Sequence, residues 1–161
     1  MIGMDPQLLD PESETSKRIE FYRAALDRIF VVVLESYGKS PFGKFLSFLK
    51  TWREARSALK NEQFDLISTQ DPFVTGLIGY FLKLEFNLPL QLQIHTGLFT
   101  PYFWMESEKN RMYVRLARIL LPRADCIKVV SQGIRKYLIE RLNIDSSKIY
   151  TLPVFTSFER F

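Results

Sequence analysis

The sequence is poor in cysteine, in histidine and in long apolar runs, and each shortage excludes a class of protein. Its one cysteine, Cys126, cannot form an intramolecular disulfide or a cysteine-based zinc site, which fits a reducing cytoplasm. No uninterrupted apolar stretch approaches the roughly 18 residues that a membrane-spanning helix needs. The opening residues are acidic and broken by proline, unlike a secretory signal. We expect a soluble protein, or one that lies on a membrane surface.

The charge is only weakly biased toward one sign. Lys and Arg total 22 against 18 Asp and Glu, for a net charge of +4, which permits an anionic partner without requiring one. The basic residues are interleaved with acidic ones and no nucleic-acid recognition motif accompanies them, so nucleic acid binding is not expected. The G-x-S-x-G turn of serine hydrolases is absent. No pattern indicates a metal or a resident cofactor.

The chain alternates segments of helical periodicity with apolar, strand-like segments. Its 161 residues, of which 47% are hydrophobic, suffice for one domain with a real core. Helices are expected at 14–27, 41–60, 72–84, 106–121 and 132–142, and strands at 29–34, 66–69, 90–94, 126–130 and 148–152. This order predicts an α/β fold with a Rossmann-like, doubly wound, mostly parallel sheet and helices on both faces.

Both ends of the chain read as interrupted elements. Residues 1–5 resemble the last residues of a first strand, and the final residues run out of a strand and stop. In a doubly wound sheet the first strand is central, so shortening it would leave backbone edges unpaired. We therefore expect residues 1–161 to be a single Rossmann-like domain of a larger protein. A complete small domain with a short first strand is the alternative.

The segment 64–101 is the most informative part of the chain. A buried strand runs into Asp71-Pro72, where Asp is a favoured N-cap and Pro a favoured first helical residue. The next strand, 90–94, is followed by His95, Thr96 and a glycine. In a parallel sheet both turns lie at the carboxyl ends of the strands, where such folds bind ligands. The segment is therefore a candidate site.

Each of these residues also has a structural interpretation. An imidazole can donate or accept a hydrogen bond and titrates near neutral pH, but a lone histidine is often half-buried and bonded to backbone carbonyls. For Asp71, a role as a helix cap is favoured. The alternative is that the free amides at the start of this helix hold a ligand's hydroxyl or phosphate groups. Gly76 and Gly79 fall within a helix rather than in a turn. We expect them to allow close packing of that helix on the sheet.

Four segments occur in an order that resembles a known family: DLISTQDPFVTGLIGYFLK, LPLQLQIHTGLFTPYFW, ADCIKVVSQGIRKYL, and KIYTLPV followed four residues later by ERF. Their order and spacing are similar to the N-terminal domain of family 4 glycosyltransferases of the GT-B architecture, over residues 3–161. The resemblance implies a two-domain enzyme that transfers a sugar from a nucleotide-sugar donor to a hydroxyl, usually with retention of configuration. The N-terminal domain mainly holds the acceptor, which is a glycan or a lipid-linked molecule, and the C-terminal domain holds most of the donor.

The resemblance also suggests site residues. His95 is the candidate catalytic residue, since it would contact the transferred sugar or stabilise charge during transfer. The candidate substrate-binding residues are Gly3, Arg18, Asp71 and Thr96, with Arg18 placed to meet a diphosphate across the cleft. The family's C-terminal domain is absent, its glycine-rich first turn is reduced to Gly3, and Ser157 stands where an aspartate is common. We therefore expect the chain to be inactive by itself.

Two helices combine basic and apolar faces. Arg111, Arg115 and Arg118 follow one stripe of helix 106–121. Helix 41–60 carries an apolar stripe of Phe42, Phe45, Leu46, Leu49 and Trp52. Solvated helix faces explain both patterns; the alternative is contact with anionic lipid headgroups at the inner face of the cytoplasmic membrane. A non-catalytic α/β module that docks on a membrane or a partner protein is thus the second interpretation of the chain.

Overall fold

The computed structural model describes residues 1–23, 25–35 and 40–153, apart from the side chains of Glu14, Arg18 and Phe21. The strands of this part are β1 (Ile2–Gly3), β2 (Val32–Val33), β3 (Ile67–Thr69), β4 (Leu90–Ile94), β5 (Cys126–Val129) and β6 (Ile149–Thr151). The α-helices are α1 (Glu14–Arg23), α2 (Pro41–Asn61), α3 (Val74–Phe86), α4 (Pro101–Glu106), α5 (Glu108–Leu120) and α6 (Gln132–Leu142). Ser157 and the final ERF segment lie outside the described residues.

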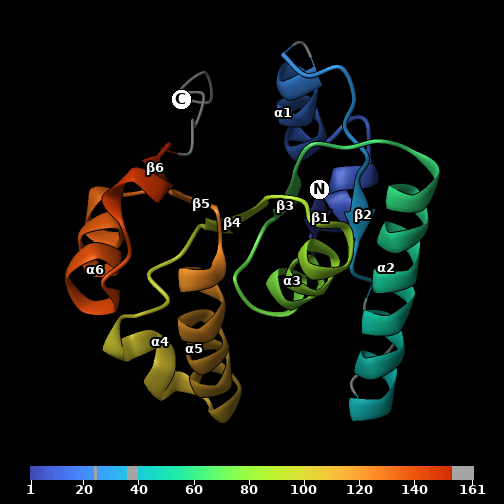
Figure 1. The fold of residues 1–161 in the computed structure, drawn as a ribbon. Coiled ribbons are helices and arrows are strands. Elements are labelled where there is room, and N and C mark those ends of the chain that lie inside the picture. Colours follow the sequence, from blue (N-terminus) through green and yellow to red (C-terminus); the bar gives the residue numbers. More distant parts are fainter. Residues whose placement is uncertain (24, 36–39, 154–161) are drawn as a thin grey trace.

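The described strands form one parallel sheet in the order β2-β1-β3-β4-β5-β6. From β1 the chain moves outward to β2, returns to β3 on the other side of β1, and then continues in one direction. Right-handed crossovers therefore place α1 on one face and the later helices on the other. Figure 1 shows α1 above the strands and α2, α3 and α5 below them. The Rossmann-like α/β fold with helices on both faces is confirmed, although α1 is the one helix of the described chain on its face.

The first two strands are shorter than an ordinary strand. We expected a strand over 29–34, but β2 comprises only Val32 and Val33. Its described partner is β1, which offers Ile2 and Gly3 for pairing. A strand is defined by its ladder of backbone hydrogen bonds, so the short β1 limits β2 to the same length.

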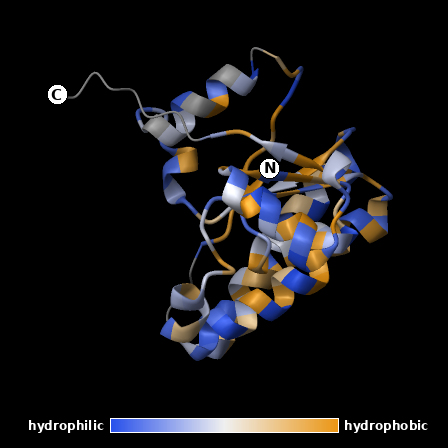
Figure 2. Cartoon of the chain, turned by 90° about the vertical axis from the view of Figure 1, so that its left-hand side faces the viewer, coloured by the Kyte–Doolittle hydropathy of each residue, from blue (hydrophilic) through white to orange (hydrophobic). Residues whose placement is uncertain are grey.

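The two faces of the sheet differ in polarity. Leu92, Ile94 and Ile127 point to the helix layer and are almost fully buried. On the face of α1, the Ser68 hydroxyl donates to Gln91 Oε1 at 2.9 Å, and Gln93 Nε2 donates to Ser68 Oγ at 3.0 Å. The helices that cover the apolar face carry both hydrophobic and hydrophilic residues (Figure 2), as amphipathic helices on a sheet do. The core therefore lies between the strands and this helix layer.

Helix α3 contains two glycines whose added Cβ atoms would meet close neighbours. A Cβ added at Gly79 would lie 2.6 Å from Thr69 Cγ2 and 2.8 Å from Leu90 Cδ1. At Gly76 it would lie 2.8 Å from the Asp71 carbonyl oxygen. The approach at Gly79 confirms that this glycine serves helix-on-sheet packing. Gly76 instead leaves room for the turn before α3, since the nearest sheet atom, Leu92 Cδ2, would lie at 3.4 Å.

Several element boundaries differ from the expected ones. The helix expected at 106–121 is preceded by α4, and α5 starts only after Ser107, whose hydroxyl oxygen accepts from the Asn110 amide at 3.1 Å as an N-cap. Thr100-Pro101 was the missed start signal of α4. Helix α1 ends at Arg23, earlier than the expected Asp27. By contrast, α2, β4 and α6 match their expected ranges to within one residue.

Candidate functional site

The expected site residues gather at the carboxyl edge of the sheet. His95 and Thr96 directly follow β4, and Gln70 and Asp71 directly follow β3. The Gln70 amide donates to the Ile2 carbonyl at 3.0 Å, which joins the end of β3 to β1. The chain reverses its direction of strand addition between β1 and β3, and open α/β sheets bind ligands at such a switch point.

The loop that carries His95 is anchored on both sides. Leu98 inserts into the core with 1% of its surface exposed. The Phe99 ring stacks on Tyr137 of α6, with ring centroids 4.6 Å apart and planes 9° apart. Within the loop, the Leu98 amide donates to the Thr96 carbonyl at 2.8 Å. His95 and Thr96 are consequently exposed on a loop whose backbone is well supported.

Asp71 closes the turn between β3 and α3. Its Oδ1 accepts from the Phe73 amide at 2.7 Å, and its Oδ2 accepts from the Thr75 hydroxyl at 2.6 Å. We expected the helix to start at Pro72, but regular α-helix begins at Val74 because residues 72 and 73 form a turn around the carboxylate. The expected role of Asp71 as the helix N-cap is therefore wrong, because Phe73 is the N-cap and no side chain caps the helix. The Asp71 carboxylate instead holds the preceding turn together, which is a structural role.

Burial raises the pKa of the Asp71 carboxyl above its ordinary value of 3.8, against the lowering effect of the hydrogen bonds from Thr75 and from the backbone amides of Phe73, Thr75 and Val74. A carboxyl whose pKa is higher in the folded state binds its proton more tightly there. The contribution of this carboxyl to stability is therefore favourable at low pH. It is lost as the pH rises from the pKa of the carboxyl in the unfolded state through its higher pKa in the folded state.

Asp71→Asn should remove this component of the pH dependence, because the amide keeps an acceptor for the Phe73 amide but does not ionise. We expect the difference in free energy of unfolding, variant minus wild type, to increase as the pH rises above about 4. Urea denaturation at a series of pH values measures it. The exposed Asp65→Asn is the matched control, and parallel profiles for wild type and Asp71→Asn would contradict the expectation.

Gly3 lies beneath other side chains at the end of β1. A Cβ at this position would lie 2.5 Å from Gln70 Oε1, and it would also contact a methyl group of Leu8. Gly3 is therefore buried, and the side chain that covers it at the switch point belongs to Gln70. Sequence reasoning missed Gln70, although its position immediately after β3 was a usable signal. The expected contact of Gly3 with substrate stays a prediction.

The segment that leads into α1 is tied to the end of β1. Asp5 Oδ1 accepts from the Gln7 amide at 3.0 Å, and Asp5 Oδ2 accepts from the Thr15 hydroxyl at 3.3 Å. The first turn of α1 therefore lies close to the carboxyl edge. Arg18 belongs to α1, but its side chain lies outside the described part, so its expected contact with a diphosphate stays a prediction.

The site offers hydrogen-bonding groups rather than metal ligands. The imidazole of His95, the hydroxyl of Thr96 and the amide of Gln70 can donate and accept hydrogen bonds to a polyhydroxylated ligand. Over the described ranges, no three His, Cys, Asp or Glu side chains come close enough to hold a metal ion. In the same part of the chain, no helix is both long and apolar enough to cross a bilayer.

A comparison with protein families agrees with this arrangement. The family model described as Glycosyltransferase Family 4 matches residues 3–160, which include β2 to β6 and all the candidate residues. A search of curated proteins finds no match. The family match covers both the sheet and the carboxyl-edge loops, and it agrees with the segments that suggested the resemblance. The chain belongs to glycosyltransferase family 4.

Proposed function

We propose that this chain supplies the acceptor-binding side of a glycosyltransferase, which moves a sugar from a nucleotide-sugar donor to a hydroxyl of a glycan or lipid-linked acceptor. The proposal rests on one observation about this family 4 chain. His95 and Thr96 are exposed at the carboxyl edge of the sheet, on a loop that is anchored by Leu98 and Phe99. Ligands of open parallel sheets bind at this edge.

In the proposed reaction, the bond between the anomeric carbon and the donor diphosphate breaks, and a bond to the acceptor oxygen forms with retention of configuration. The nucleoside diphosphate leaves with the electron pair of the broken bond, and its departing phosphate oxygen takes the proton that the acceptor hydroxyl gives up. His95 hydrogen-bonds to the transferred sugar and stabilises the charge that develops there. Thr96 binds an acceptor hydroxyl. A second, donor-binding domain holds the diphosphate, so the present chain binds weakly and does not catalyse transfer alone.

The remaining candidates have supporting roles in this proposal. Arg18, in the first half of α1, is the residue proposed to bind the diphosphate. Asp71 shapes the β3–α3 turn, and Gly3 leaves room for Gln70 to face the ligand. The reaction takes place in the cytoplasm, at the inner face of the membrane when the acceptor is lipid-linked.

An NMR titration of the isotopically labelled chain tests the proposal. The probes are UDP-glucose and GDP-mannose as donors, and octyl glucoside and maltose as acceptors. We expect millimolar binding that shifts the backbone amides of Gln70, Thr96 and Gly97, since all three lie at the carboxyl edge. The amide of Glu62, at the opposite end of the helix layer, is the internal control. Shifts that avoid the carboxyl edge, or none with any probe, would contradict the proposal.

A non-catalytic docking module is the second candidate function. It is favoured by large apolar side chains that α2 and α3 expose to solvent. The two functions differ in what they require of His95, because a docking module needs no imidazole at the sheet edge. Sugar-dependent shifts near His95 therefore support the enzyme, whereas their absence together with membrane or protein binding supports the module.

A further inference from the structure

The sheet face on the side of α1 carries a band of polar side chains across β3, β4 and β5. We call Ser68, Gln91, Gln93, Cys126 and Lys128 the polar band. The parallel register places Gln91 beside Ser68 and Cys126, and it places Gln93 beside Lys128. Strands inside a parallel sheet are usually apolar on both faces. The polar band therefore needs an explanation other than core packing.

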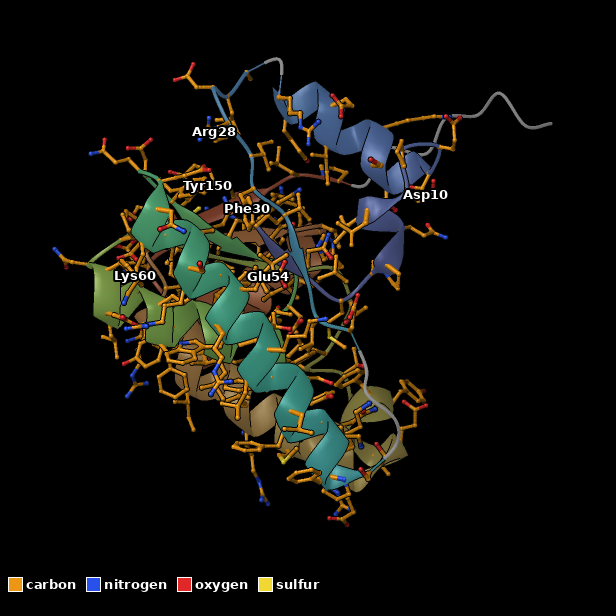
Figure 3. All side chains as sticks on the ribbon, turned by 90° about the vertical axis from the view of Figure 1, so that its right-hand side faces the viewer. Asp10, Arg28, Phe30, Glu54, Lys60 and Tyr150 are labelled. Carbon is orange, nitrogen blue, oxygen red and sulfur yellow. The ribbon has the colours of Figure 1, made fainter. Side chains whose placement is uncertain are left out.

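Helix α1 does not pack its apolar side chains on the polar band. Its buried Ile19 forms a small cluster with Leu8 and Val33, which places this contact on the β2 side of the sheet. Figure 3 shows α1 and α2 on opposite sides of the strands, with Tyr150 of β6 at a height between the two helices. The apolar packing of α1 in the described chain thus leaves the polar band unexplained.

Lys128 is the charged member of the polar band. It is half-buried, and no carboxylate pairs with it in the described part of the chain. Its Nζ donates to the Tyr22 hydroxyl of α1 at 3.3 Å and lies 5.7 Å from the centroid of the Tyr22 ring. By contrast, the half-buried Lys83 pairs with Asp125. A partly desolvated ammonium without a counter-ion is costly, so an anion bound beside Lys128 would compensate its charge.

The contact between Lys128 and Tyr22 leaves hydrogen atoms that can still be donated. An ammonium has three N–H groups, and the Tyr22 hydroxyl accepts one of them. Because this hydroxyl accepts from Lys128, its own O–H is available to another acceptor. Tyr22 is 47% exposed, so a ligand can reach it. An oxygen anion at this place would accept charge-assisted hydrogen bonds from the ammonium and a further bond from the hydroxyl.

The polar band leads to the candidate site. Gln93 lies beside Lys128, and His95 is the next residue in the alternation along the same strand. With a rise of about 3.3 Å per residue and strands about 4.8 Å apart, the Cα atoms of Lys128 and His95 lie about 8 Å apart. Gln93 Nε2 donates to Ser68 Oγ at 3.0 Å and to Gln91 Oε1 at 3.4 Å, which fixes the side chain between them. A ligand at His95 can therefore place one of its groups beside Lys128.

We propose that Lys128 and Tyr22 form a subsite for an anionic group of the acceptor, either a carboxylate or a phosphate. This inference rests on the proposed acceptor-binding role of the chain and makes it more specific. The anion accepts from Lys128 Nζ and from the Tyr22 hydroxyl, while the acceptor hydroxyl that receives the sugar lies near His95. The polar band offers hydrogen-bonding groups to the part of the acceptor between these two points. The acceptor is then an acidic or phosphorylated sugar rather than a neutral one.

An NMR titration of the isotopically labelled chain tests the subsite. The probes are glucose, glucuronate, glucose 6-phosphate and inorganic phosphate. We expect at least one of the two anionic sugars to bind about tenfold more tightly than glucose, with shifts of the Gln93 and Lys128 backbone amides. The anionic sugar that is preferred identifies the group as a carboxylate or a phosphate. The preference should decrease as salt rises from about 0.05 to 0.5 M, because the subsite is partly exposed.

Substitutions separate the charge of Lys128 from its packing. Lys128→Met keeps an unbranched side chain and should abolish the preference for the anionic sugar, whereas Lys128→Arg should retain it. Tyr22→Phe keeps the ring beside the ammonium and should weaken binding of the anionic sugar about threefold. The matched control is Lys148→Met, since Lys148 is also half-buried but donates to the Ala124 carbonyl at 3.3 Å, at the amino edge of the sheet. It should leave the preference unchanged, and circular dichroism should show that each variant is folded.

Equal affinities of the wild-type chain for glucose and for both anionic sugars would overturn the subsite, and this comparison needs no variant. So would an undiminished preference in Lys128→Met, or shifts that centre on Lys148. Inorganic phosphate separates the subsite from the proposed function. If phosphate shifts the Lys128 amide while no sugar shifts the amides of the carboxyl edge, the anion subsite stands and the acceptor-binding role fails. Sugar binding at the carboxyl edge without any preference for an anion would have the opposite meaning.

Discussion

Gly79→Ala should lower the free energy of unfolding by about 1–3 kcal/mol, although alanine is the better helix former. Its methyl group would meet Thr69 and Leu90 at 2.6 and 2.8 Å, and both neighbours are buried in the sheet. Relief requires α3 to move away from β3 and β4, which opens the core along the helix. Urea denaturation at neutral pH measures the effect.

Gly133→Ala is the matched control, because Gly133 also lies in a helix that follows a strand. Its added methyl would meet only Ser131 Oγ, at 3.9 Å, so no neighbour has to move. Helix propensity then dominates, and the variant should gain up to about 1 kcal/mol. Equal stabilities for the two variants would show that α3 packs less closely on the sheet than the structure indicates.

His95→Ala should lower sugar transfer by about 100-fold when the chain works with its donor-binding domain, with little change in stability. The loss of one group that stabilises developing charge typically has an effect of this size. His95 is exposed, and substitutions of exposed residues usually change the free energy of unfolding by less than about 0.5 kcal/mol. Initial rates of transfer and thermal unfolding of the same preparations separate the two effects.

Two variants make this result specific. His95→Gln keeps a hydrogen-bond donor at the position and should recover part of the rate. Tyr102→Ala removes a side chain that is 90% exposed in the segment just after the His95 loop, and it should leave the rate unchanged. Wild-type turnover by His95→Ala would exclude a catalytic role for this residue. An equal loss of rate and of folded protein would show a structural role instead.

Local signals predicted most of the secondary structure. Ser40-Pro41 marked the start of α2, where Ser40 Oγ accepts from the Gly43 amide at 3.0 Å, and Asn87 adopts the left-handed conformation, with a φ of 52°, that ends α3. Such caps act within one helical turn, so the sequence contains them in full. The strand over 29–34 was predicted too long because its length depends on β1, a partner far away in the chain.

Part of the candidate site was also predictable from signals that are local in the sequence. The strand that precedes His95 and the parallel sheet followed from periodicity, and together they place His95 at the carboxyl edge. The cover of Gly3 by Gln70 depends on two strands that lie side by side only after folding. Asp71 was expected as a cap, but its carboxylate closes a turn of residues 72 and 73, and the helix begins only at Val74.

The amino-acid sequence by itself determined the alternation of strands and helices, some of their caps and the family, because these depend on neighbouring residues and on segment order. Only the tertiary structure decided which sheet face is polar, which helices share a layer and which apolar side chains stay exposed. The pattern of α2 shows the reason. Its aromatic stripe would have suited a core, but the buried residues of α2 are Gly43, Ser47, Thr51 and Ala55, and Trp52 is only partly buried against the core while Phe42 and Phe45 stay exposed.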